Sequence, residues 1–253
     1  MNTRKRKWIP PCLYTMNPIF LGVFIVTFIA LNLTEPGGSG SNLFWGGIAF
    51  QADPNSLDLI NLGRWMLFVS PYILFACVLS EQELNNMGPY VIPRYQSYTR
   101  WWRSKVLSLM MGCLIYLVVG MIETMIHLDF SGQSVQDIGL ANIGLSLCLT
   151  FLHLYLISLL ILAGHTLFLN QHVIALGALG LEGITLLPAM MDAKVSRFMF
   201  GTWGMLYRSN LVNQTFGFHI IAILLVQAIL CAILIVGMPY VLKRRGVFST
   251  LRV

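Results

Sequence analysis

The chain has 253 residues, of which 57% are hydrophobic and only 10% are charged, and its mean hydropathy is +0.73. A soluble domain carries about 25% charged residues, so this chain cannot cover itself with a charged surface, and a soluble globular domain is all but excluded. Disorder is excluded too, because disordered chains are poor in apolar residues. The net charge of +6 would raise nucleic acid as a partner of a soluble protein, but in a membrane protein the positions of the basic residues matter more.

Six apolar stretches are candidates for membrane spans, which need about 20 mostly apolar residues each. They cover residues 17–34, 63–80, 106–127, 143–169, 173–190 and 216–242. The fifth has the weakest pattern, because Glu182, Pro188 and several glycines interrupt it. The sequence therefore predicts an all-α, polytopic membrane protein in which residues 1–253 form a single transmembrane domain.

The basic residues gather in three segments that six spans would place on one side of the membrane. Residues 4–7, the loop 94–105 and the tail 243–252 together hold 12 of the 16 Lys and Arg residues. By the positive-inside rule this side is the cytoplasm, so both termini are expected there. Five spans would put the C-terminal cluster outside, so the charges favour the fifth span.

The cytoplasmic loop 81–105 has the most distinctive pattern. Glu81 and Glu83 open it, and Pro93 and Ser97 are placed to begin short helical turns. From residue 98 a helix is predicted to continue into the third span. One face of that helix is predicted to hold Tyr98, Trp101, Trp102 and Lys105. The pattern indicates an amphipathic element at the cytoplasmic surface. The alternative is a membrane-surface hairpin whose aromatic residues lie at headgroup level and whose arginines bind anionic lipids.

This loop resembles that of the permeases of type-2 ABC (ABC-2) exporters. The matching residues are Glu81 or Glu83, Gly88, Pro93, Arg94, Ser97, Trp101, Trp102 and Lys105. The sequence departs from the family pattern in having two acids that compete for one position. The resemblance implies an amphipathic coupling helix between spans 2 and 3 that docks into a separate ATPase. The implied docking residues are Glu81, Glu83, Tyr90, Pro93, Arg94, Tyr95, Ser97, Tyr98, Arg100, Trp101 and Trp102.

The variant of the loop in this chain is similar to that of small permeases found with bacteriocin or antimicrobial-peptide export and immunity systems. The resemblance implies a transport subunit, not an enzyme, that moves a peptide or other amphipathic substrate across the bacterial cytoplasmic membrane. No phosphate-binding GxxxxGK[ST] motif is present, so ATP and Mg are expected in a partner ATPase, present in two copies, and no cofactor in this chain. The other expected partners are a second permease, identical or homologous, and membrane lipids, but no nucleic acid.

Polar residues inside spans are functional candidates, because they are costly in lipid. Glu182 lies in the middle of the fifth span and is expected to face a dimer cavity or a polar partner on a neighbouring helix. Gly177, Gly180 and Gly183 recur at every third residue and predict a stripe for close helix packing.

The outer segment 191–215 combines aromatic residues with arginines, and it predicts a re-entrant or interfacial helical pair. The functional interpretation is an exit gate or a cap, and the alternative is an aromatic girdle. The candidates for a translocation cavity or gate are Glu182, Trp203, Tyr207 and Arg208.

Two other function classes stay open. An intramembrane enzyme of protease type would need paired Glu and His residues on facing spans. Glu123 and His127 lie four residues apart on the third span, whereas the other histidines are dispersed and no HExxH motif is present, so no metal site is predicted. A non-transporting accessory or immunity protein is the other alternative.

Overall fold

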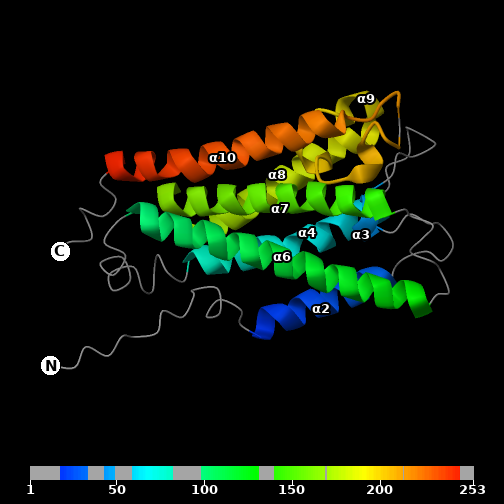
Figure 1. Ribbon diagram of the computed structural model, residues 1–253, viewed down its shortest axis with the longest axis horizontal. Coiled ribbons are helices and arrows are strands. Elements are labelled where there is room, and N and C mark those ends of the chain that lie inside the picture. Colours follow the sequence, from blue (N-terminus) through cyan, green and yellow to red (C-terminus); the bar gives the residue numbers. More distant parts are fainter. Residues whose placement is uncertain are drawn as a thin grey trace.

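The computed structural model describes residues 18–33, 43–48, 59–81, 98–130, 140–168, 170–212 and 214–245 (Figure 1). Its helices are α2 (Pro18–Leu33), α3 (Leu43–Gly46), α4 (Leu59–Glu81), α6 (Tyr98–Phe130), α7 (Leu140–Phe168), α8 (Gln171–Met191), α9 (Ala193–Ser196), the short 3-10 helices η3 (Phe200–Thr202) and η4 (Leu206–Arg208), and α10 (Ile220–Arg245). Within these ranges the chain forms no strand, apart from one isolated bridge between Ser209 and Phe218. The all-α prediction is confirmed for this part of the chain.

Five helices, α4, α6, α7, α8 and α10, are long and apolar enough to cross a membrane. These helices indicate a membrane protein. One of them, α8, corresponds to the fifth predicted span, the one with the weakest pattern. The first stretch forms the 16-residue α2, which is about 24 Å long at 1.5 Å per residue and falls short of a hydrocarbon core of about 30 Å. Five spans are therefore supported by length and composition, and the six-span arrangement stays a prediction.

Helix α7 lies at the centre of the bundle and packs against α4, α6, α8 and α10 (Figure 1). Two thirds of its most apolar stretch are buried, whereas only 22% of the corresponding stretches of α8 and α10 are covered. The buried side of α7 also carries polar residues, namely Ser146, Thr150, His153, Ser158, His165 and Thr166. Ser146, Thr150 and His153 share one side of the helix at steps of three and four residues.

An aromatic cluster attaches α2 to the bundle. The Tyr116 ring of α6 lies 4.6 Å from the Phe24 ring and 5.0 Å from the Phe28 ring, between ring centroids. Such pairs contribute about 0.5–1.5 kcal/mol each beyond their buried area. At the other end of α2, Arg64 Nη2 donates to the Leu31 carbonyl at 3.3 Å, which places a cation at the helix C-terminus.

The 33 residues of α6 form one helix, about 50 Å long, that runs the length of the bundle (Figure 1). The predicted continuation from Tyr98 into the third span is confirmed. The start of α6 and the end of α10 lie at one end of the molecule, and α3 and α9 lie at the other (Figure 1). The basic residues at the start of α6 and the end of α10 therefore share one end, as the positive-inside pattern requires.

Candidate functional site

His153 of α7 and Glu182 of α8 form a buried acid–histidine pair. His153 Nε2 lies 2.8 Å from Glu182 Oε1, and both side chains are 0% exposed. Each residue lies near the middle of its helix, so the pair is far from both ends of the bundle. A charge in such a place is tolerated when it is paired. Of the two expectations for Glu182, the structure shows the polar partner on a neighbouring helix.

The chain that follows α8 folds back over this pair. We call residues 193–212, which include α9, η3 and η4, the cap. The Phe200 ring lies 4.9 Å from the His153 ring, centroid to centroid. A Cβ atom at Gly204 would lie 3.0–3.2 Å from three atoms of His153, and one at Gly201 would lie 3.1 Å from the Glu182 carbonyl oxygen. Glycines at these two positions let the cap backbone lie directly on the pair, against the middle of α7 and α8.

Three hydrogen bonds from the spans hold the cap backbone in place. Thr150 Oγ1 of α7 donates to the Gly204 carbonyl at 3.1 Å, and Gln227 Nε2 of α10 donates to the Trp203 carbonyl at 3.2 Å. The Gly201 amide donates to Thr185 Oγ1 of α8 at 2.9 Å. Non-helical backbone at membrane depth needs such partners, because the hydrocarbon offers none.

The predicted gate residues Trp203, Tyr207 and Arg208 all lie in the cap, whereas Glu182 lies beneath it on α8. The Trp203 ring packs against Phe200 at 5.5 Å, and the Tyr207 ring lies so close to Gly46 that a Cβ atom there would come within 2.3 Å of it. Arg208 is buried, and its Nε donates to the Ile48 carbonyl at 2.9 Å while Nη1 donates to the Ala189 carbonyl at 3.2 Å. Burial lowers the pKa of Arg208 to about 10, so the guanidinium is still charged at neutral pH. The two hydrogen bonds of the Arg208 guanidinium connect the cap to α8 and to the segment after α3.

Replacing Arg208 with lysine is expected to lower the free energy of unfolding by about 2 kcal/mol, because one ammonium cannot reproduce the fork that reaches both carbonyls. Thermal unfolding of the purified protein in lipid nanodiscs measures the effect. The matched control is Arg197→Lys, since Arg197 is exposed on the same cap. Equal unfolding temperatures for the two variants would contradict the role given to Arg208.

Most of the predicted docking segment, from Glu83 to Ser97, lies outside the described residues. Within them, Glu81 is half-buried at the end of α4, and Arg100 and Arg103 are exposed in the first turns of α6. Trp101, Trp102 and Lys105 share one face of α6 as predicted, but this face is turned into the bundle, where each side chain is at most 2% exposed. Trp101 and Trp102 therefore pack inside the bundle and are not available for docking. Arg100 is the predicted docking residue whose side chain is exposed in this part of the chain, and Arg103, which was not predicted, is exposed beside it.

The Trp102 side chain forms a hydrogen bond with a carbonyl of α10 that lacks its usual helical donor. Its Nε1 donates to the Ile235 carbonyl at 3.0 Å. In a regular helix the amide of residue 239 would donate to that carbonyl, but residue 239 is proline and has no amide hydrogen. The indole therefore supplies the hydrogen bond that Pro239 removes.

The other ionisable candidates do not join the His153–Glu182 pair. Glu123 and His127 are half-buried on α6, and His165 is buried three turns along α7 from His153. His172 and His219 are exposed. Among the described residues, no three His, Cys, Asp or Glu side chains gather closely enough to hold a metal ion.

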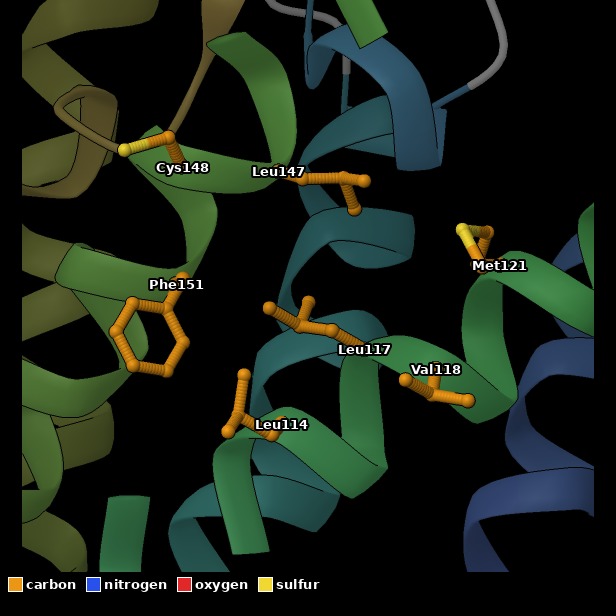
Figure 2. A pocket seen from close by; sticks show the side chains of 7 residues that line it. All are labelled: Leu114, Leu117, Val118, Met121, Leu147, Cys148 and Phe151. Carbon is orange, nitrogen blue, oxygen red and sulfur yellow. The ribbon is translucent and has the colours of Figure 1, made fainter. Parts of the chain in front are cut away.

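An apolar groove of about 260 Å³ lies between α6 and α7. Figure 2 shows the side chains around it, which come from both helices and contribute almost no polar surface. They are Leu114, Leu117, Val118, Met121, Leu147, Cys148 and Phe151.

Sequence reasoning missed His153 as the partner of Glu182, and it missed Thr150 and Gln227 as cap-binding residues. All three are polar residues inside apolar spans, which is a signal that the sequence carries. The identity of each partner depends on the relative register of helices that are distant in the chain. No family model, curated protein or solved structure matches the chain.

Proposed function

We propose that this chain is the membrane permease subunit of an ABC exporter of the ABC-2 type. It would move a peptide or another amphipathic substrate across the bacterial cytoplasmic membrane. A separate ATPase, in two copies, would bind ATP and Mg and drive the movement, and a second permease would complete the complex. The proposal rests on the resemblance of the loop 81–105 and on the membrane-spanning helical architecture of the chain.

The observation that supports coupling best is the continuity of α6. Arg100 and Arg103 are exposed in its first turns, at the same end as the exposed Lys243 and Arg244 of α10. Together they form a basic surface at one end of the bundle. Because α6 is a single helix of 33 residues, a push on its first turns would move its opposite end as a rigid body.

The exposed apolar surfaces of α8 and α10 support the proposal of a second permease subunit. Only 22% of the most apolar stretches of α8 and α10 are buried within the chain. A Cβ atom added at Gly177, Gly180 or Gly183 of α8 would meet nothing within 4 Å. The predicted glycine stripe is thus open in the single chain, and its surface is available to lipid or to a second permease.

Replacing both Arg100 and Arg103 with alanine is expected to reduce the amount of co-purifying ATPase about tenfold, because each exposed charge contributes about 0.5–1 kcal/mol to an interface. The tagged chain would be purified from its native host and the bound ATPase quantified by mass spectrometry. Arg197→Ala is the matched control, because it removes an exposed arginine from the opposite end. If no ATPase accompanies the parent chain, or if the double variant retains it fully, the proposal fails.

One observation favours a second candidate, an intramembrane enzyme. The His153–Glu182 pair places an acid and a histidine on facing spans, 2.8 Å apart, as such an enzyme would need. The cap covers the pair, so a substrate would reach it only after the cap moves. Loss of a hydrolytic activity in Glu182→Gln, with ATPase co-purification absent from the parent chain, would favour this candidate over the permease.

A further inference from the structure

We propose that α10 contains a hinge at Pro239 and that the Trp102 indole of α6 holds this hinge in the helical state. The last turns of α10, residues 240–245, would bend away from the bundle when the hydrogen bond from the indole is lost. The hinge is inferred from contacts within the chain and does not depend on the transport proposal.

The turn of α10 formed by residues 235–239 lacks one helical hydrogen bond. Pro239 has no amide hydrogen, so the Ile235 carbonyl is without the donor that a regular helix supplies. Gly237 lies in the same turn, and glycine and proline have the lowest helix propensities of all residues. Sharp bends in long helices concentrate at proline. Helix α10 nevertheless continues without interruption from Ile220 to Arg245.

The missing hydrogen bond is supplied by another helix. Trp102 Nε1 donates to the Ile235 carbonyl at 3.0 Å. The Trp102 side chain is 0% exposed, and its ring lies 6.3 Å from the ring of Trp101, centroid to centroid, so packing fixes the indole in place. Both tryptophans belong to the first turns of α6, and the state of the hinge therefore depends on where those turns lie.

The hinge has neighbours on one side only within the described part of the chain. Val236 and Tyr240 are 62% and 70% exposed, and a Cβ atom at Gly237 would meet nothing within 4 Å. On the other side, Met238 and Leu242 are buried in the apolar core. Without the indole bond, only this apolar packing would hold residues 240–245 in line, and a bend toward the open side would meet no side chain of the described residues.

The position of Trp102 in the chain gives the hinge a way to respond to a partner. Trp102 lies between Arg100 and Arg103, which are exposed in the same turns of α6. A hydrogen bond is lost once donor and acceptor are more than about 3.5 Å apart, so a shift of about 1 Å in these turns would release α10. An ATPase that docks on the two arginines would act on α10 through this contact, and this use of the hinge rests on the proposed function.

The test measures backbone hydrogen–deuterium exchange of residues 240–245 by mass spectrometry, with the purified chain in lipid nanodiscs. Trp102→Phe keeps an aromatic ring but removes the donor, and it is expected to speed this exchange about fivefold, the effect of losing one hydrogen bond. Pro239→Ala restores the helical donor to the Ile235 carbonyl. In that background Trp102→Phe should change the exchange less than about twofold.

Trp65→Phe is the matched control, because Trp65 is a buried tryptophan on α4 whose Nε1 has no hydrogen-bond partner among the described residues. It should leave the exchange of residues 240–245 unchanged. Replacement of Trp102 by benzothienylalanine removes the N–H group but keeps the size of the ring, and it serves if Trp102→Phe does not fold.

Three results would overturn the proposal. They are unchanged exchange in the Trp102 variants, a rise of equal size in the Pro239→Ala background, and a rise of equal size in Trp65→Phe. The single chain is used throughout, so these results are distinct from a failure of the ATPase to co-purify, which would contradict the proposed function and leave the hinge in place.

Discussion

Replacing His153 with alanine is expected to lower the free energy of unfolding by about 3–5 kcal/mol. The change leaves the Glu182 carboxyl group 0% exposed and without its partner, and it opens a cavity beneath the Phe200 ring. Removal of one member of a buried pair is costly because the other cannot be solvated. The measurement is thermal or denaturant-induced unfolding of the purified protein in lipid nanodiscs, followed by intrinsic tryptophan fluorescence.

The control for this prediction is His172→Ala, because His172 is an exposed histidine on α8. It is expected to change the free energy of unfolding by less than about 0.5 kcal/mol. If His153→Ala were as stable as this control, the pair would contribute nothing to the fold, and the geometry described for it would be wrong.

Gly217→Ala is expected to cost about 3 kcal/mol, at the upper end of the range for overpacking. A Cβ atom at this position would lie 2.3 Å from both the carbonyl carbon and the oxygen of Ser209. These are backbone atoms, so no side-chain rotation can relieve the clash. The segment is also fixed by hydrogen bonds from the Phe218 amide to the Arg208 carbonyl at 3.0 Å and from the Asn210 amide to the Phe218 carbonyl at 2.8 Å. The expected result is a cap that detaches, together with a lower unfolding temperature.

Gly180→Ala is the matched control, because a Cβ atom there meets nothing within 4 Å and alanine favours the helix. It should be neutral or stabilise the single chain by about 0.4–1 kcal/mol. Equal stability of the two alanine variants would contradict the close approach at Gly217. Limited proteolysis of the segment 193–219 adds a readout that is specific for detachment of the cap.

The helices were predictable because an apolar stretch of about 20 residues has few structures other than a helix in a membrane. The residues at which the helices begin and end were harder to predict. Helix α6 continues to Phe130, and α10 begins at Ile220, since the backbone of Phe218 pairs with the cap instead. Hydropathy cannot detect such a local competition for backbone hydrogen bonds.

The direction of a helix face was the harder prediction. Trp101, Trp102 and Lys105 share a face as their spacing indicated, but in a membrane protein apolar faces meet both lipid and protein. The inward direction of Trp102 matches its hydrogen bond to the Ile235 carbonyl of α10, which Pro239 leaves without its helical donor. That contact joins residues 133 positions apart, and no local pattern contains it.

For the candidate site, the sequence predicted that Glu182 has a polar partner but not which residue that partner is. Glu182 required a polar partner because an acid in the middle of a span is costly, and the structure supplies one. Which histidine it is depends on the register between α7 and α8. The cap itself left a signal in the glycines at 201, 204 and 217, which its close backbone contacts require.

The pairing of His153 with Glu182 is tested most directly by a double-mutant cycle in lipid nanodiscs. The cycle compares His153→Leu, Glu182→Leu and the double variant by their free energies of unfolding. The pair predicts a coupling energy of about 2 kcal/mol, with the double variant less damaged than the sum of the two single variants. Free energies that add to within about 0.5 kcal/mol would mean that the two side chains do not interact, and they would contradict a paired site beneath the cap.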